Sequence, residues 1–230
     1  MAIRHSEYLS PTDIIDSNHE RIIEYAGKVA GDETDPAKVA VRLYYAVRDG
    51  IWYDPYVPFH LAKHYRASSV LEKGRGYCVY KASLLCALGR ARGIETRVGF
   101  ADVRNHLATR QLVEFMGTDI FACHGYSEFF LGGKWIKATP AFNVELCKRH
   151  GVAPLEFDGI HDSVFQPFDL EHNQFMDYVK DRGTFADIPI DVILDGWKEV
   201  YGEDRVQAWI EIYEQAGDKS PRDFYKEDII

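Results

Sequence analysis

Two of the four cysteines lie in one stretch of the sequence, "GRGYCVYKASLLCALGRARGIETRVGF", which begins at Gly74. Gly74 and Gly76 precede Cys78, so the backbone can turn sharply and leave the thiol in the first turn of a helix. The unpaired N–H groups and the dipole at a helix start favour a thiolate, and the same N–H groups can donate to a developing oxyanion. The position of Cys78 therefore predicts a nucleophile.

Cys86 lies two turns further along the same predicted helix, beside Leu84, Leu85 and Leu88. A thiol in an apolar helix interior behaves as a small buried hydrophobe, and burial raises its pKa. We predict that Cys86 has a structural role in a stripe of small residues that lets the helix approach its neighbour closely. The stripe consists of Cys78, Ala82, Leu85, Cys86 and Gly89.

A cysteine nucleophile needs a base, and a predicted hairpin offers one. Gly132 and Gly133 form a two-residue turn signal between "HGYSEFFL" and "KWIKAT". The pairing that follows is Leu131 with Lys134, Phe130 with Trp135 and Glu128 with Lys137. This register places His124 at the beginning of its strand, with Thr139 as a diagonal neighbour on the same face. We predict that His124 is the base and that Thr139 can orient its ring.

Other interpretations of these residues stay open. His106, in "VRNHL", is the main rival base and lies at the loop end of its own predicted strand. A metal site built from Cys123 and His124 is disfavoured, because neighbouring residues on a strand point to opposite faces. Tyr126, Trp52 and Tyr53 can line a cleft, but aromatic residues more often belong to the core. The four cysteines include no CxxC pair, so we expect reduced thiols and no metal or other cofactor.

The elements around this region predict an α+β protein. "HERIIEYAGKVAG" and the segment from Pro36 to Gly50 have apolar residues at helical spacing. The segment "IWYDPYVPFH" mixes aromatic residues with two prolines, which predicts an extended strap. "ETRVGFADVR" predicts a strand after the cysteine helix. Near the end of the chain, "DVILDGWKEVYG" and "EDRVQAWIEIYEQAG" predict two amphipathic helices that pack on the cleft or cover it.

These segments together resemble a known family. The stretch that contains Cys78, followed by "HGYSEFFLGGKWIKATPAFN", is similar to the transglutaminase-like superfamily, whose core is related to papain-type cysteine proteases. The resemblance covers about residues 37–143. It implies an α+β fold in which a central helix carries the nucleophile and packs on an antiparallel sheet. It also implies a Cys-His-Asp triad that acts on amides, with Cys78 and His124 at the positions of nucleophile and base.

The sequence departs from this family at the third member of the triad. The family has an aspartate where "WIKATP" has Thr139. A hydroxyl group can accept a hydrogen bond from an imidazole but carries no charge that stabilises an imidazolium. Asn143 is a second candidate, because papain-type enzymes use asparagine in this role, although Pro140 interrupts the strand between it and His124. The fold can also bring in a more distant carboxylate, and these alternatives are Asp102, Asp158 and Asp162.

Composition limits the class of protein and its partners. The 230 residues are 46% hydrophobic and 13% aromatic, which is enough for one large folded domain. Residues 151–230 contain 19 Asp and Glu against 7 Lys and Arg, a net charge of −12, which disfavours a nucleic-acid surface there. No window approaches the roughly 20 apolar residues of a membrane span, and no apolar run follows the N-terminus. We expect a soluble cytoplasmic protein.

We therefore expect a single transglutaminase-like domain over residues 1–230, with a core at about 37–143 and an acidic, mainly helical extension over 144–230. The expected function is a cysteine-dependent hydrolase or acyltransferase whose substrate is a peptide or protein amide. Hydrolysis is favoured over cross-linking, because no feature of the sequence marks a site for an amine acceptor. The alternative is a binding module that keeps this fold without efficient catalysis, which the missing aspartate at position 139 suggests.

Overall fold

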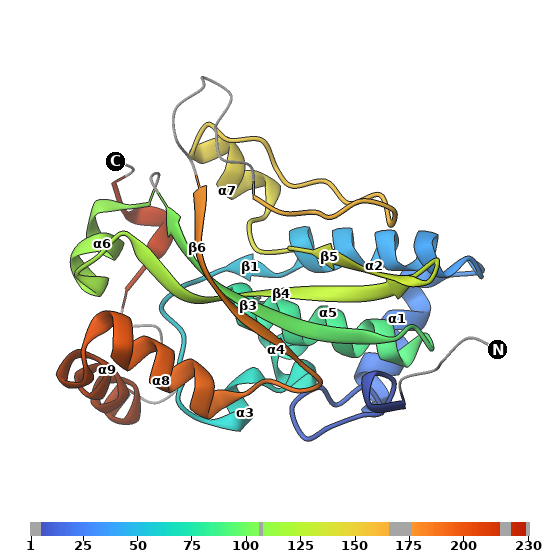
Figure 1. Cartoon of the computed structure of the whole chain (residues 1–230), viewed down its shortest axis with the longest axis horizontal. Coiled ribbons are helices and arrows are strands. Elements are labelled where there is room, and N and C mark those ends of the chain that lie inside the picture. The colour runs from blue at the N-terminus through green and yellow to red at the C-terminus, as the bar shows by residue number, and fades with distance from the viewer. Residues whose placement is uncertain (1–5, 106–107, 166–175, 217–221, 229–230) are drawn as a thin grey trace.

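The computed structural model describes residues 6–105, 108–165, 176–216 and 222–228, and it confirms the predicted α+β class. The main sheet is antiparallel, with strand order β5-β4-β3-β6 (Figure 1). These strands are β3 (Thr96–Asn105), β4 (Ile120–Leu131), β5 (Lys134–Ala138) and β6 (Met176–Phe185). A central helix, α5 (Cys78–Ala91), packs on β3 and β4.

The β4–β5 hairpin has the register that the sequence predicts. Leu131 pairs with Lys134, Phe130 with Trp135 and Glu128 with Lys137. Gly132 and Gly133 both have positive φ, which their lack of a side chain permits at low cost. The pairing ends at Ser127 and Ala138, one residue before Thr139.

Small residues let α5 lie close to the sheet, as predicted. A Cβ atom on Gly89 would lie 2.5 Å from the Thr96 side chain and 2.8 Å from the Phe129 ring. The Ser127 hydroxyl donates to the Ala82 carbonyl at 3.1 Å. These contacts leave no space between the middle of α5 and strands β3 and β4.

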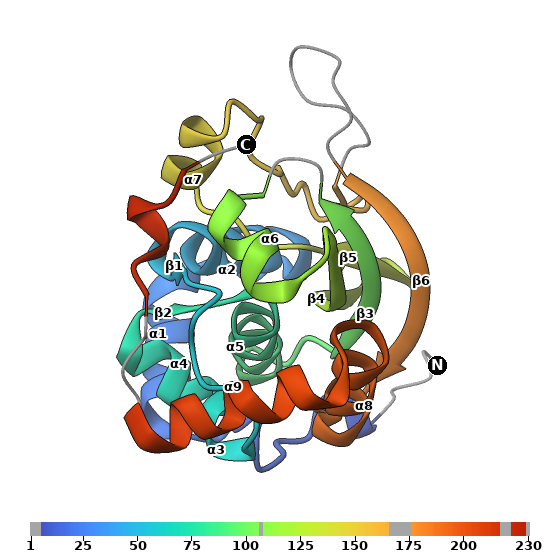
Figure 2. The same ribbon diagram turned by 90° about the vertical axis from the view of Figure 1, so that its left-hand side faces the viewer.

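Four helices cover the opposite side of α5, which Figure 2 shows end-on between them and the sheet. They are α1 (Glu20–Ala30), α2 (Pro36–Gly50), α3 (Ala62–Tyr65) and α4 (Ala67–Lys73). Lys81 of α5 is fully buried, and its Nζ donates to the carbonyls of Arg48 at 2.9 Å and Ile51 at 2.7 Å. This buried amine, whose pKa burial lowers to about 7, ties α5 to the C-terminal end of α2.

The rest of the chain adds helices and short strands. The remaining elements are the short strands β1 (Trp52–Tyr53) and β2 (Arg75–Gly76), the helices α6 (Arg110–Met116), α7 (Val144–Arg149), α8 (Ile190–Tyr201) and α9 (Glu203–Ala216), and the 3-10 turns η1 (Ser6–Tyr8) and η2 (Phe224–Lys226). The predicted helices near the C-terminus are present as α8 and α9. The prediction of a mainly helical extension missed β6, which comes from this region and pairs with β3 along the edge of the sheet.

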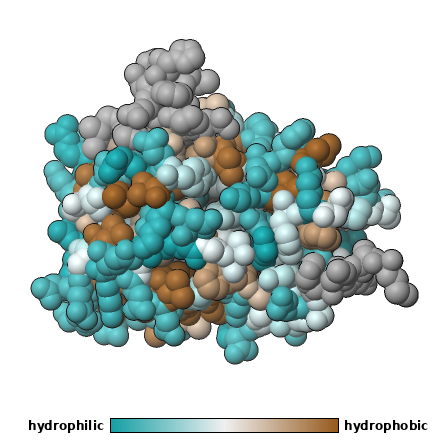
Figure 3. Space-filling model, in the orientation of Figure 1, coloured by the Kyte–Doolittle hydropathy of each residue, from teal (hydrophilic) through white to brown (hydrophobic). Residues whose placement is uncertain are grey.

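The face of the molecule in Figure 3 is mostly hydrophilic, with apolar residues in scattered patches. Exposed large apolar side chains come from separate elements, such as Ile23 of α1, Trp52 of β1 and Val192 of α8. Within the described part of the chain, every helix is too short or too polar to cross a membrane.

Candidate active site

Cys78 is the first residue of α5, and the chain before it turns through two glycines. Gly74 has φ +65° and ends α4, so the predicted sharp turn uses the left-handed region there. Gly76 has an ordinary φ but no room for a side chain, because a Cβ atom would lie 2.4 Å from the Tyr80 ring. Cys78 itself is 7% exposed. Both glycines therefore determine the path of the backbone that leads to Cys78 at the start of α5.

The strap at residues 51–60 runs beside this turn, as an extended segment that is mostly buried. Its strand β1 pairs in parallel with β2, so Trp52 lies opposite Arg75 and Tyr53 lies opposite Gly76. Tyr53 is 4% exposed, whereas Trp52 is 47% exposed. The strap thus brings Tyr53 next to the residues that precede Cys78.

A β-bulge in β4 precedes His124. Ala101 of β3 pairs with His124 and Val103 pairs with Phe121, so three steps along β4 match two steps along β3. Cys123 lies in this bulge with φ +55°, a left-handed conformation that non-glycine residues rarely adopt. Bulges bend a strand and redirect its side chains, and they are frequent beside active sites. The direction of the His124 side chain depends on this bulge.

Gly125 brings β4 into contact with the beginning of α5. A Cβ atom on Gly125 would lie 2.9 Å from the Val79 Cα and 3.3 Å from its backbone nitrogen. Because a side chain is absent, the Gly125 N–H reaches the Cys78 Sγ and donates to it at 3.4 Å. The thiol therefore lies against the residue that follows His124.

Cys78 and His124 line the same cavity, which has a volume of about 60 Å³, enough for a few water molecules. Aromatic side chains form most of the remaining wall: Tyr53, Phe59, Tyr77, Phe115, Phe121, Trp197, Tyr201, Trp209 and Tyr213. Four of these come from α8 and α9, so the C-terminal helices cover the cavity as the sequence suggested. A bound peptide needs more room than this volume leaves.

Helix α8 is attached directly to the bulge in β4. The Tyr201 hydroxyl accepts a hydrogen bond from the Ala122 N–H at 2.8 Å. The Trp197 indole N–H donates to the Ala122 carbonyl at 3.1 Å. Both backbone groups of Ala122, two residues before His124, are thus bonded to side chains of the covering helix.

Burial shifts the two candidate catalytic groups in opposite directions. It raises the pKa of Cys78 to about 11, although the N–H groups of Gly125, Val79 and Cys78 itself lower the pKa in part. Burial lowers the pKa of His124 to about 3. Both shifts disfavour the charged form. In the closed cavity the pair is therefore a neutral thiol and a neutral imidazole.

Thr139 is buried beyond the end of β5, and its backbone carbonyl accepts a hydrogen bond from Tyr44 at 3.1 Å. The Thr139 hydroxyl and the His124 Nε2 are both buried, and neither has a hydrogen-bond partner among the residues that the structure describes. The ring of His124 packs against Phe165, with 5.0 Å between ring centroids. The structure thus leaves the orienting role of Thr139 as a prediction.

Two of the alternative third members are engaged elsewhere. The Asn143 side-chain oxygen accepts hydrogen bonds from the Tyr53 N–H and the Tyr225 hydroxyl, each at 3.3 Å. Asp102 forms a bidentate ion pair with Arg182, at 2.6 and 2.7 Å. Neither side chain has a described hydrogen bond to His124.

The more distant carboxylates are also bonded away from the cavity. Asp158 is exposed and pairs with His161 at 2.7 Å. Asp162 accepts a hydrogen bond from the Lys137 N–H at 2.9 Å. His106, the rival base, lies outside the described residues.

The remaining cysteines differ from Cys78 in their surroundings. Cys86 is fully buried, its thiol donates to the Arg97 carbonyl at 3.3 Å, and burial raises its pKa to about 11. Cys123 contacts α8, and burial raises its pKa to about 12. Cys147 is buried in α7. All four thiols are free, and the described residues include no group of three or more His, Cys, Asp and Glu side chains that could hold a metal ion.

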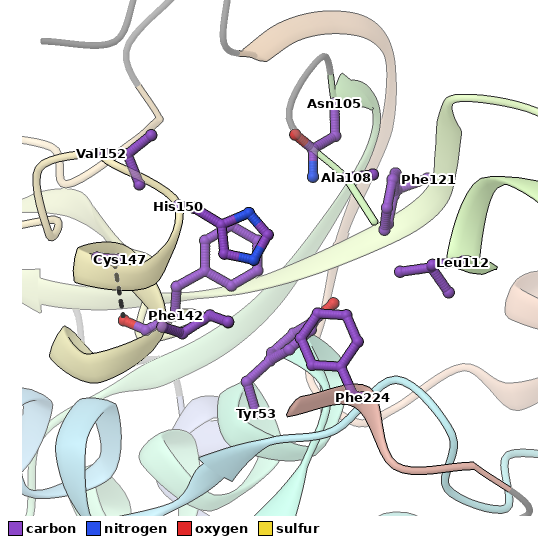
Figure 4. Close-up of a pocket in the computed structure, with 11 residues that line it drawn as sticks. Tyr53, Asn105, Ala108, Leu112, Phe121, Phe142, Cys147, His150, Val152 and Phe224 are labelled. Carbon is purple, nitrogen blue, oxygen red and sulfur yellow. Dashed lines mark hydrogen bonds between the residues drawn. The ribbon is translucent and has the colours of Figure 1, made fainter. Parts of the chain in front are cut away.

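A second cavity adjoins the first, because Tyr53, Leu112 and Phe121 line both. Figure 4 shows side chains from the strap, α6, β4 and α7 around it, with Asn105 across from Tyr53 and Phe224. Its other walls are apolar: Ala108, Phe142, Leu146, Val152 and Phe224, with Cys147 beside them. No Asp, Glu, Lys or Arg is among the described residues that line either cavity.

Comparison with known proteins identifies the family of the chain. The sequence pattern of the Transglutaminase-like superfamily matches residues 23–140, about half of the chain, so the protein belongs to this superfamily. The match confirms the family that the sequence suggested. It ends before α8 and α9, so the helices that cover the cavity lie outside it. No curated protein matches the chain.

Two solved structures resemble the chain at low sequence identity. The first is described as a "putative cysteine protease" from Cytophaga hutchinsonii, with 17% identity and a TM-score of 0.50 over 83% of this chain. The second is described as a "putative protease" from Parabacteroides distasonis, with 16% identity and a TM-score of 0.37 over 52% of this chain. The chain spans 50% of the first structure and 23% of the second. At this identity the first similarity shows the fold alone.

Proposed function

We propose that the protein is a cysteine-dependent hydrolase or acyltransferase that acts on amide or peptide bonds. Cys78 is the nucleophile and His124 is the base in this proposal. The observation that carries it is the contact between the Gly125 N–H and the Cys78 sulfur, together with the cavity that Cys78 and His124 both line. Membership of the transglutaminase-like superfamily supports the same assignment.

The reaction that this site would perform is acyl transfer through a thioester. The Cys78 sulfur attacks the carbonyl carbon of the amide, and His124 accepts the thiol proton. The tetrahedral intermediate then breaks its C–N bond, and the histidine returns the proton to the leaving amine. Water, activated by the neutral histidine, hydrolyses the thioester and regenerates the thiol. We favour water over an amine as the second nucleophile, because no feature of the sequence marks a site for an amine acceptor.

The beginning of α5 supplies donors for the oxyanion. The first N–H groups of a helix have no acceptor within the helix, and that of Cys78 is closest to the reacting carbonyl. Tyr53 is the second donor in our proposal, because it lines the cavity and the position of β1 beside β2 holds it near Cys78. Burial is the largest cause of its raised pKa, followed by the charge that a Cys78 thiolate would carry, so the hydroxyl keeps its proton and can donate.

The cavities suggest which substrates fit. Their described walls are aromatic and aliphatic, without ionised side chains, so desolvation penalises a charged group that enters. We propose an acyl donor with a large apolar side chain near the reacting carbonyl. The substrate must displace part of the aromatic cover from α8 and α9.

A cytoplasmic location also belongs to this proposal.

Thiol labelling tests the proposed nucleophile. The native protein is treated with iodoacetamide at pH 6 to 9, and each cysteine is followed by peptide mass spectrometry. We expect Cys78 to react faster than Cys86, although burial raises the pKa of both thiols to about 11. His124→Gln should slow Cys78 and leave Cys86 unchanged. Equal, slow labelling of all four cysteines, or no effect of His124→Gln, would reject the activated thiol.

Peptide amides then test the reaction itself. Substrates with Phe or Leu beside the reacting carbonyl should be cleaved faster than substrates with Glu or Lys. Cys78→Ala should abolish cleavage, whereas Cys86→Ala, a matched removal of a buried thiol in the same helix, should retain it. Cleavage that persists in Cys78→Ala would overturn the proposal.

A binding module is the second candidate function. The observation that favours it is the Thr139 hydroxyl, which stands at the family's aspartate position without a hydrogen-bond partner among the described residues. A module of this kind would use the apolar cavities to bind a ligand without covalent chemistry. It predicts that Cys78→Ala keeps the biological function, and loss of function in that variant would exclude it.

A further inference from the structure

Asp102 and Arg182 form a buried ion pair at the bulge that precedes His124. Their side chains are 5% and 8% exposed. The Arg182 Nε donates to Asp102 Oδ1 at 2.6 Å, and its Nη2 donates to Oδ2 at 2.7 Å. Asp102 Oδ1 also accepts the Cys123 N–H at 2.9 Å. One carboxylate thus connects β3, β4 and β6.

We propose that Asp102 and Arg182 are positioning residues for His124, an inference that rests on the proposed function. The bulge places Cys123 in a left-handed conformation and lets its N–H donate to a side chain rather than to a neighbouring strand. The two ladder pairs on either side, Ala101 with His124 and Val103 with Phe121, differ by one residue in register. The Asp102 carboxylate accepts the Cys123 N–H, which lies between these two pairs. A strand without the bulge would lose this charge-assisted hydrogen bond. Flattening would also rotate His124 away from its present direction, because side chains alternate along a strand.

Helix α8 packs on the same pair. The Arg182 Nη1 lies 3.0 Å from a Glu199 carboxylate oxygen, and Lys180 pairs with Glu199 at 2.8 Å. Gly196 makes the close approach possible, because a Cβ atom there would lie 2.6 Å from the Cys123 sulfur and 3.1 Å from the Arg182 guanidinium carbon. Helix α8 therefore contacts both the bulge, at Cys123, and the ion pair that supports it, at Arg182.

A second ion pair in the same sheet provides a matched control. Arg97 of β3 and Glu128 of β4 pair at 2.5 Å, and their side chains are 21% and 5% exposed. Their strands are those of Asp102 and His124, but Glu128 lies four residues beyond His124, in the regular part of the ladder. Loss of this pair removes a buried charge interaction without touching the bulge.

Histidine NMR spectra test the positioning independently of catalysis. The ring signals of His124 are assigned by their loss in His124→Gln and are then followed in Asp102→Asn, Arg182→Lys and Glu128→Gln. Asp102→Asn keeps a side-chain acceptor for the Cys123 N–H but loses the charge, and Arg182→Lys keeps the charge but loses the bidentate contact. We expect both to move the His124 signals and Glu128→Gln to leave them in place. Equal spectra in all three variants would overturn the proposal.

The labelling rate of Cys78 then connects the position of the ring to its chemistry. Asp102→Asn should lower the rate at pH 7 about tenfold and change its pH profile to that of an unassisted thiol. Arg182→Lys, which keeps the positive charge, should lower the rate less. Glu128→Gln should keep the wild-type pH profile of Cys78 labelling, although urea unfolding should show a loss of stability similar to that of Asp102→Asn. An unchanged pH profile of Cys78 labelling in Asp102→Asn would overturn the positioning role. Equal labelling rates of Cys78 in the wild type and in His124→Gln would instead reject the proposed function.

Discussion

Replacing Gly125 with alanine would place a methyl group against the backbone of the helix that carries Cys78. The new Cβ atom would lie 2.9 Å from the Val79 Cα, closer than real Cβ contacts, and 3.0 Å from its Cγ2, closer than most of them. Backbone atoms in the first turn of α5 cannot rotate away as a flexible side chain can. Strand β4 and helix α5 must therefore separate at the point where the Gly125 N–H meets the thiol.

The expected cost follows from this overlap. Overfilling a packed interior destabilises a protein by about 1–3 kcal/mol. For a chain of this size each kcal/mol lowers the melting temperature by about 2–4 °C, so we expect a decrease of about 2–12 °C. The separation also weakens the Gly125 N–H bond that lowers the pKa of Cys78, so the thiolate fraction should fall. Labelling of Cys78 at pH 7 should slow several-fold.

Thermal unfolding and iodoacetamide labelling together measure both effects. Gly27→Ala is the matched control, because Gly27 lies in α1 with ordinary φ and a Cβ atom added there would have no other atom within 4 Å. There the methyl group should stabilise the helix by about 0.5–1 kcal/mol and leave Cys78 labelling unchanged. If Gly125→Ala were as stable and as reactive as the wild type, the close approach of β4 to the thiol would not control its chemistry.

Two further predictions concern His124. Burial lowers its pKa from 6.5 to about 3, so between these values the unfolded chain binds a proton that the native protein does not, and stability falls as the pH drops. Between pH 6.5 and 4 the wild type should lose about 3 kcal/mol more than His124→Gln, measured by urea unfolding, and equal losses would contradict the burial effect. Thr139→Asp should supply the missing carboxylate, raise the pKa of His124 by about 1–3 units and speed Cys78 labelling, whereas the neutral Thr139→Asn should not. Identical labelling in both variants would show that position 139 does not reach the ring.

The parts of the site that the sequence predicts depend on local rules. The start of α5 follows from two glycines and the apolar pattern behind them, and the hairpin register follows from Gly132 and Gly133. In each case a few neighbouring residues determine the backbone, so no distant contact is needed. The small residues of α5 also indicate a close neighbour, although the pattern alone does not identify it as β3 and β4.

Strand β6 was missed for a physical reason. Its sequence, "MDYVKDRGTF", lacks an apolar alternation, because half of its residues are exposed at the edge of the sheet and only one is buried. Charged side chains are common on edge strands, where they prevent pairing with other chains. Arg182 nevertheless points to the bulge and pairs with Asp102 across 80 positions in the sequence. Local patterns do not encode a contact of this range.

Gly125 and the bulge at Cys123 were also missed. Gly125 lies inside the predicted strand "HGYSEFFL", and a glycine within a strand is a known signal of close backbone approach or of a bulge. That signal was present one residue after His124. The left-handed conformation of Cys123 has no such signal, because it depends on the Asp102 carboxylate and on α8.

The two pKa shifts have a shared origin that connects the C-terminal helices with the chemistry. Burial is the largest cause for both Cys78 and His124, and it widens the gap between their pKa values from about 2.5 units (6.5 and 9.0) to about eight (about 3 and about 11). Proton transfer from the thiol to the ring then costs on the order of 10 kcal/mol before the ions attract each other. Water that enters when Trp197 and Tyr201 leave the cavity would move both values toward those of free side chains and remove most of this cost. Two of the helices that cover the cavity, α8 and α9, lie outside the family match, and the acid sensitivity of His124 measures one of the two pKa shifts directly.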